Sequence, residues 1–147
     1  MKKNYYENKS LKKIKECWDS KHPDLKTGRW GEICIHPSIP LLDDEEDKQG
    51  AHFEFTPNGG KRNDLTNYGV EIHNCGLKNL DQYIKMLDNK QIDNHPINIS
   101  YDSRKTKCWR ARIAIPKKSG EEYCVSIMEK FRDMFIQKLK SNNYFNK

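Results

Sequence analysis

Four ionisable side chains stand at alternate positions in two short segments near the middle of the chain. The segment 51–56 contains His52 and Glu54, and the segment 67–74 contains Glu71 and His73. A metal-dependent nuclease needs such groups, because its carboxylates hold Mg²⁺ while a further side chain steadies the attacking water. Glu54, Glu71 and His73 are therefore the candidate catalytic residues.

This pattern departs from that of a restriction-type nuclease at two points. Such an enzyme carries an acid on one strand and Glu-x-Lys on the next, but Glu71-Ile72-His73 has an imidazole in place of Lys. The preceding acid, Asp64, falls in a Gly-rich loop rather than on a strand. A metal-dependent nuclease is thus an alternative hypothesis, and we assign no metal and no other cofactor.

A second candidate functional site, for binding rather than catalysis, is the basic segment 101–118, YDSRKTKCWRARIAIPKK. It has seven cations and one acid, and its net charge of +6 equals that of the whole chain of 147 residues. Cations that neutralise phosphates supply much of the affinity of proteins for nucleic acids, and an acidic protein surface would serve equally well. The predicted binding residues are Arg104, Lys105, Lys107, Arg110, Arg112, Lys117 and Lys118.

The clustering of arginine is more informative than the overall charge. Lys outnumbers Arg by 21 to 6, a bias that an AT-rich genome can produce, so the pI of about 9.0 is weak evidence for nucleic acid. Three of the six Arg residues nevertheless fall in 101–118, and the planar guanidinium fork suits phosphate.

The elements that position these residues follow from the hydrophobic periodicity. Alternation predicts five strands, over 28–36, 51–56, 67–74, 96–101 and 107–115. Helical spacing predicts three helices, over 5–18, over about ten residues from Asn79, and over 119–140. Short loops between strands favour antiparallel neighbours. We expect an α+β two-layer sandwich of about five mostly antiparallel strands with helices on one face, in the order α-βββ-α-ββ-α.

Helices that cover one face of this sheet leave the other face polar. The polar parity carries His52, Glu54, Glu71, His73, Asn98, Ser100, Arg110 and Arg112. We expect this face to be open. Three interpretations stay open: a solvated face with cross-strand ion pairs, a recognition surface with Trp30 or Tyr101 available for stacking, and the catalytic site above.

Several segments follow one another in an order that resembles that of a bacterial domain family. GVEIH (69–73) precedes LDQYIKMLDNKQI (80–92), and NIS, WRARIAIP (109–116) and EKFRDMFIQKL (129–139) follow. This order is similar to an uncharacterised bacterial domain family, a domain of unknown function found at the C-terminal end of restriction-endonuclease-like proteins. The resemblance covers about residues 50–140. It implies a context of defence or DNA processing and supplies no active residues.

Length and cysteine usage set the remaining expectations. A chain of this size fits a single domain, 1–147, in which 37–50 forms a flexible acidic loop with five consecutive acids from Asp43 to Asp47. Five Cys without paired spacing, and the lack of a signal peptide or long apolar run, predict a cytoplasmic protein with reduced thiols and no membrane contact.

The sequence therefore favours a non-enzymatic basic binding protein that contacts nucleic acid or an acidic protein surface through the hairpin 101–118. The first alternative is a small protein-binding inhibitor or adaptor, such as a phage counter-defence factor. The second is the metal-dependent nuclease. A homodimer formed through the polar face is also open, with Trp30 as its anchor.

Overall fold

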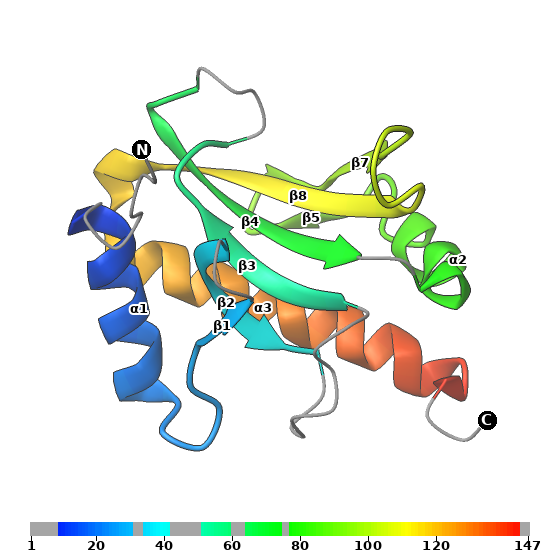
Figure 1. The fold of residues 1–147 in the computed structure, drawn as a ribbon, viewed down its shortest axis with the longest axis horizontal. Helices are drawn as coiled ribbons and strands as arrows, with labels where there is room; N and C mark the ends of the chain where they lie inside the picture. The colour runs from blue at the N-terminus through cyan, green and yellow to red at the C-terminus, as the bar shows by residue number, and fades with distance from the viewer. Residues whose placement is uncertain (1–8, 31–33, 42–50, 60–63, 75–76, 145–147) are drawn as a thin grey trace.

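Alternating apolar side chains build one antiparallel sheet, which dominates the computed structural model (Figure 1). The structure describes residues 9–30, 34–41, 51–59, 64–74 and 77–144. Within these residues the main sheet has six strands in the order β1-β2-β3-β4-β8-β7. The strands are β1 (Gly28–Trp30), β2 (Cys34–Pro40), β3 (Ala51–Thr56), β4 (Asn67–Asn74), β7 (Asn98–Tyr101) and β8 (Trp109–Pro116).

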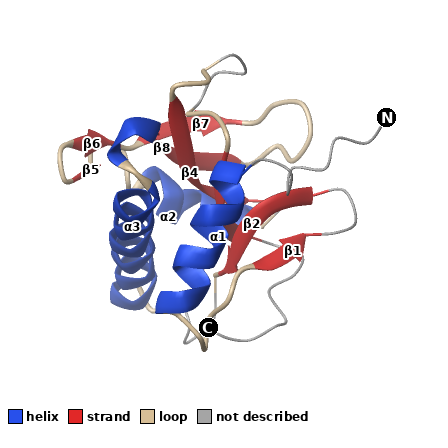
Figure 2. Ribbon diagram, turned by 90° about the vertical axis from the view of Figure 1, so that its left-hand side faces the viewer, coloured by secondary structure: helices blue, strands red, loops and turns tan. Residues whose placement is uncertain are grey.

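The helices of the described residues pack on one face of this sheet, with α1 and α3 side by side (Figure 2). They are α1 (Lys9–Lys21), α2 (Asp81–Lys85) and α3 (Glu121–Ser141). Two short 3-10 turns precede the later helices, η3 (Lys78–Leu80) before α2 and η4 (Lys117–Ser119) before α3. A small separate hairpin pairs β5 (Gln91–Ile92) with β6 (His95–Pro96).

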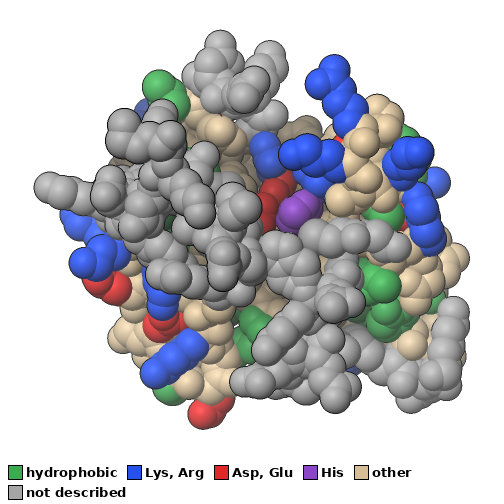
Figure 3. All heavy atoms as spheres, viewed as in Figure 1, with side chains coloured by type: hydrophobic (Ala, Val, Ile, Leu, Met, Phe, Trp, Pro, Cys, Tyr) green, Lys and Arg blue, Asp and Glu red, His purple; other side chains and the backbone are tan. Residues whose placement is uncertain are grey.

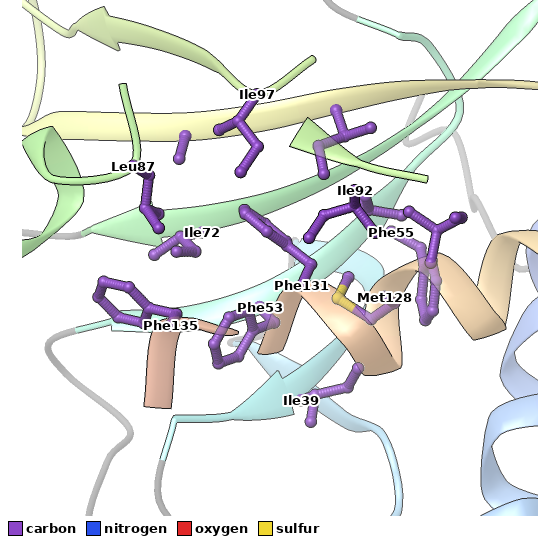
Figure 4. Close-up of a cluster of buried hydrophobic side chains, with 14 of the residues drawn as sticks. Ile39, Phe53, Phe55, Ile72, Leu87, Ile92, Ile97, Met128, Phe131 and Phe135 are labelled. Carbon is purple, nitrogen blue, oxygen red and sulfur yellow. The ribbon is translucent and has the colours of Figure 1, made fainter. Parts of the chain in front are cut away.

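The core lies between the helices and the sheet. The ring of Phe53 meets Phe131 and Phe135 of α3 edge to face, with ring centroids 6.2 and 6.1 Å apart (Figure 4). Trp18 of α1 packs against Phe55 at 6.2 Å and donates a hydrogen bond from its indole N–H to the Leu25 carbonyl. Such edge-to-face pairs add to the stabilisation from burial, so α1 and α3 are both anchored to β3.

The predicted α+β class, the antiparallel pairing and the placement of helices on one face are confirmed. The predicted strands 51–56 and 67–74 coincide with β3 and β4. The predicted strand 28–36 is instead two antiparallel strands, β1 and β2, in which Trp30 pairs with Cys34. The main sheet therefore has one strand more than the five that periodicity predicts.

The first residues of the predicted acidic loop 37–50 form a strand instead. Residues 37–40 belong to β2, and Ser38 and Pro40 pair with Glu54 and His52 of β3. The two prolines suggested a loop, but β1 pairs with β2 only as far as Ser38. Pro40 thus has a strand on one side alone, where proline is tolerated. The acidic run 43–47 lies outside the described residues.

None of the helices in the described ranges combines the length and the apolar character that crossing a membrane requires.

One glycine lets the segment after β3 fold back against β4. A Cβ atom on Gly69 would lie 2.3 Å from Oγ1 of Thr56 and 2.6 Å from the carbonyl oxygen of Asn58. The Thr56 hydroxyl also donates a 2.7 Å hydrogen bond to that carbonyl. The missing side chain therefore allows residues 57–59 to lie close to the polar face of β4.

We predict that Gly69→Ala lowers the free energy of unfolding by about 1–3 kcal/mol, because overpacking forces the backbone at Asn58 to move. Gly28→Ala is the matched control, since a Cβ on Gly28 in β1 would meet nothing within 4 Å. Urea unfolding of both variants measures the difference. Equal stability of the two variants would show that the close approach at Gly69 is unimportant.

Candidate functional site

The antiparallel register places polar side chains in rows across the sheet face that is turned away from the helices. In one row, Glu54 pairs with Glu71, and Glu71 pairs with Arg112. In the next row, His52 pairs with His73. The predicted polar face therefore exists, and β3, β4 and β8 together hold its ionisable groups.

Contrary to the expectation from the sequence, this face is not open to solvent at its centre. His52, Glu54 and Glu71 expose only 3%, 4% and 3% of their surface. In the space-filling view, acidic and histidine side chains lie at the bottom of a hollow, with Lys and Arg side chains beside them (Figure 3). The interpretation as an ordinary solvated sheet face is therefore wrong for these three residues, and their buried polar atoms need partners within the protein.

Two imidazoles and one carboxylate meet in this face. His52 Nε2 lies 3.0 Å from Glu54 Oε2 and 3.3 Å from His73 Nδ1. His73 Nδ1 lies 3.7 Å from the same carboxylate oxygen. Burial lowers the pKa of His73 to about 4, reinforced by the Arg110 charge and opposed by Glu54. The His73 ring is therefore neutral at pH 7 and offers a nitrogen lone pair.

A carboxylate pair lies next to the histidines. Glu71 Oε2 accepts a hydrogen bond from Arg112 Nε at 2.7 Å and forms an ion pair with Arg112 Nη2 at 2.5 Å. Burial raises the pKa of Glu71 to about 8, the neighbouring Glu54 adds to this rise, and Arg112 opposes it. Like charges in a low-dielectric site resist simultaneous ionisation, so a proton on Glu71 and the Arg112 charge both relieve the repulsion within this pair.

The turn between β7 and β8 is organised by Asp102. Its carboxylate accepts hydrogen bonds from the backbone N–H groups of Arg104, Lys105 and Thr106 at 3.1–3.2 Å. It also accepts a side-chain hydrogen bond from Arg110 Nη2 at 3.0 Å. The backbone bonds from Thr106 and Lys105 hold the pKa of Asp102 far below its usual value. Sequence reasoning missed this role, although Asp-Ser-Arg-Lys is a typical Asx-turn sequence.

The structure brings together four of the seven predicted binding residues. The hollow is lined by the predicted residues Arg104, Lys105, Arg110 and Arg112, together with Glu54, Glu71 and His73. Arg110 and Arg112 are held by Asp102 and Glu71, whereas Arg104 and Lys105 are exposed. The hollow thus contains two half-buried arginines paired with carboxylates, and exposed cations lie at its rim.

The other three predicted binding residues lie elsewhere. Lys107 is exposed, and its carbonyl accepts a hydrogen bond from Lys78. The Lys117 ammonium lies 5.3 Å from the centre of the Tyr68 ring, and Lys118 is exposed in η4. The eight residues of β8 separate η4 from the turn 102–108, a distance of about 25 Å at the usual strand rise. The basic segment therefore has two separate ends.

The structure also places the predicted nuclease residues. Glu54, Glu71 and His73 are adjacent, whereas Asp64 accepts hydrogen bonds from Thr66 in its loop and from Asn67 at the start of β4. Among the described residues, the one cluster of potential metal ligands is His52, Glu54 and His73. It contains His52, which sequence reasoning did not select, in place of Glu71. Strand parity alone could not reveal that His52 lies opposite His73.

The predicted reduced thiols can be located in part. Cys17 is half-buried, and Cys108 and Cys124 are buried, all three without a disulfide. Burial raises the pKa of Cys124 to about 12, so its thiol is protonated at pH 7 and unreactive.

The chain matches no protein-family model, no curated protein and no solved structure. The resemblance to the bacterial domain of unknown function therefore stays a prediction, and the site has to be interpreted from its own geometry.

The buried carboxylate pair predicts an unusual dependence of stability on pH. Because the folded-state pKa of Glu71 lies above its unfolded value, its contribution is present at low pH and is lost as pH rises toward 8. The lowered pKa of His73 acts in the opposite sense, but only below its unfolded value of about 6.5. Between pH 6.5 and 8 we therefore expect stability to fall, by at most about 1.4 kcal/mol per pH unit.

Glu71→Gln should remove this fall, because the amide does not titrate, whereas Glu122→Gln in the exposed first turn of α3 should retain it. Urea unfolding at pH 6.5, 7.25 and 8 provides the measurement. If stability falls with pH as steeply in Glu71→Gln as in the wild-type protein, Glu71 is not the group responsible for the fall.

Proposed function

We propose that this protein is a non-enzymatic nucleic-acid-binding protein that holds a strand across the hollow of its polar sheet face. The observation that carries this proposal is the arrangement of the cations. Arg104 and Lys105 are exposed at the rim, and Arg110 and Arg112 line the same depression. A phosphate backbone that passes the rim would neutralise the exposed pair and release its counterions.

The rigidity of the rim supports this proposal. Three backbone N–H groups of the turn are bonded to one Asp102 carboxylate, which also holds Arg110. The backbone that carries Arg104 and Lys105 is thereby fixed before a ligand arrives. Preorganised contacts cost less ordering entropy on binding than contacts from a mobile loop.

An exposed aromatic ring favours a single strand as the ligand. Tyr101 is 47% exposed at the end of β7, immediately before the turn. Its ring lies 5.4 Å from that of Trp109, which supports it from one side. Bases stack on such rings when they are not paired in a duplex, and every base offers a face. We therefore propose single-stranded DNA or RNA as the ligand.

The cellular setting belongs to the same proposal. The free thiols Cys17, Cys108 and Cys124 are consistent with a reducing compartment, and we place the protein in the cytoplasm. The resemblance to a domain associated with restriction-endonuclease-like proteins adds a defence-related role. An inhibitor that binds an acidic protein surface would use the same rim cations and would show no affinity for oligonucleotides.

Two double variants separate local phosphate contacts from net charge. Arg104→Ala with Lys105→Ala removes the rim cations, whereas Lys117→Ala with Lys118→Ala removes equal charge at the far end of β8. The first should weaken binding of a single-stranded oligonucleotide and reduce the slope of log K against log salt by about 1.4, at 0.7 per phosphate contact. Fluorescence anisotropy over a salt series measures both quantities.

The control pair at Lys117 and Lys118 should leave affinity and slope close to those of the wild-type protein. Equal losses in both double variants would mean that net charge alone drives binding, and the rim would have no special role. Arg110 and Arg112 are less suitable targets, because their removal leaves Asp102 and the buried Glu71 without their cations.

A separate variant tests the aromatic contact. Tyr101→Ala should cost about 1–3 kcal/mol of binding free energy for a single strand, the usual value for one stacked base. Tyr101→Phe should retain the affinity, because stacking needs the ring and not the hydroxyl. The same anisotropy assay at fixed salt measures the affinity of both variants. An Ala variant that binds like the Phe variant would exclude stacking at this position.

A further inference from the structure

The cluster at the floor of the hollow has the dimensions of a metal site. His52 Nε2, Glu54 Oε2 and His73 Nδ1 are separated by 3.0, 3.3 and 3.7 Å. Three atoms at these separations lie on a circle with a radius of about 2 Å, which matches the 2.0–2.2 Å bonds from Zn²⁺ to His nitrogen and carboxylate oxygen. A single ion close to their plane would therefore reach all three without movement of the backbone.

The strands hold these ligands in position. His52 and Glu54 are two residues apart on β3 and thus project from the same face, and His73 pairs with His52 across β4. All three residues belong to strands with paired neighbours on both sides, and His52 and Glu54 are buried. A site built on paired strands keeps its ligands closer to a fixed geometry than a site built on loops.

The ligand types select a class of ion. Two imidazole nitrogens and one carboxylate oxygen suit Zn²⁺ and other late first-row ions, whereas Mg²⁺ and Ca²⁺ prefer oxygen ligands alone. Three protein ligands leave a coordination position open, as in catalytic zinc sites. Glu54 and His73 line the depression below Arg104 and Lys105, so the open position has access to the hollow.

We propose that His52, Glu54 and His73 bind one divalent transition-metal ion of the Zn²⁺ class, with its open coordination position facing the hollow. The nucleic-acid binding proposed above requires no metal, so this site goes beyond it. The alternative is that the protein binds no metal and that these three residues form only a hydrogen-bonded His–Glu–His group. The two possibilities differ in a direct binding measurement.

The test is a titration of the full-length, metal-free, reduced protein with Co²⁺, followed by displacement with Zn²⁺. We expect one equivalent of Co²⁺ to bind, with visible absorption bands of a four- or five-coordinate ion and without the near-ultraviolet band of a cobalt–thiolate bond. No saturable binding, or a thiolate band that places the ion on cysteine, would overturn the proposal.

Variants locate the ion. His73→Asn should weaken Co²⁺ binding by at least about 100-fold, since loss even of a residue that only hydrogen-bonds to a metal ligand costs about 10–100-fold. His95→Asn is the matched control, because His95 is half-buried and hydrogen-bonded to Tyr123 outside the cluster. Unchanged affinity of His73→Asn, or an equal loss in His95→Asn, contradicts the site.

A measurement on the wild-type protein covers the case in which His73→Asn does not fold. Bound Co²⁺ shifts the ring proton resonances of its histidine ligands far outside the normal range, and we expect two such imidazoles. A paramagnetic spectrum with no shifted histidine overturns the proposal. All of these assays omit nucleic acid, so failure of the metal site and failure of nucleic-acid binding remain distinguishable.

Discussion

The buried carboxylates Glu54 and Glu71, opposite each other on β3 and β4, impose the constraint on which the site depends. Two acids in such a position destabilise a sheet unless cations or protons compensate them. Arg112 supplies part of the compensation from β8, with one hydrogen bond and an ion pair to Glu71. Strand β8 must therefore lie next to β4, although Arg112 is 41 residues from Glu71 in sequence.

This constraint explains the concentration of charge in the segment 101–118. Alternate residues of β8, Ala111, Ile113 and Ile115, are buried in the core. Arg112 and Arg110 are held by Glu71 and Asp102. Most of the segment thus serves the fold, and its exposed cations lie in the turn and, beyond β8, at Lys118. The same acids and histidines give the hollow a floor that is rich in potential metal ligands.

Much of the fold could be predicted, because β3 and β4 alternate cleanly and α3 has a long apolar line. The alternation also identified the polar face as a set of residues. Its burial could not be predicted, since contacts on this face join residues distant in sequence, such as Arg112 and Glu71, which are 41 residues apart. His52 was missed for a related reason: alternation reveals the face of a residue but not its partner across the strand.

The most direct test of the central claim, that the hollow over β3, β4 and β8 is the binding surface, is a map of amide chemical shifts. The protein labelled with ¹⁵N is titrated with a short single-stranded oligonucleotide. We predict that the largest shifts occur in residues 101–106 and at Arg110 and Arg112, and that α1 and α3 change little. Shifts concentrated on α1 and α3, with residues 101–106 unaffected, would contradict this claim.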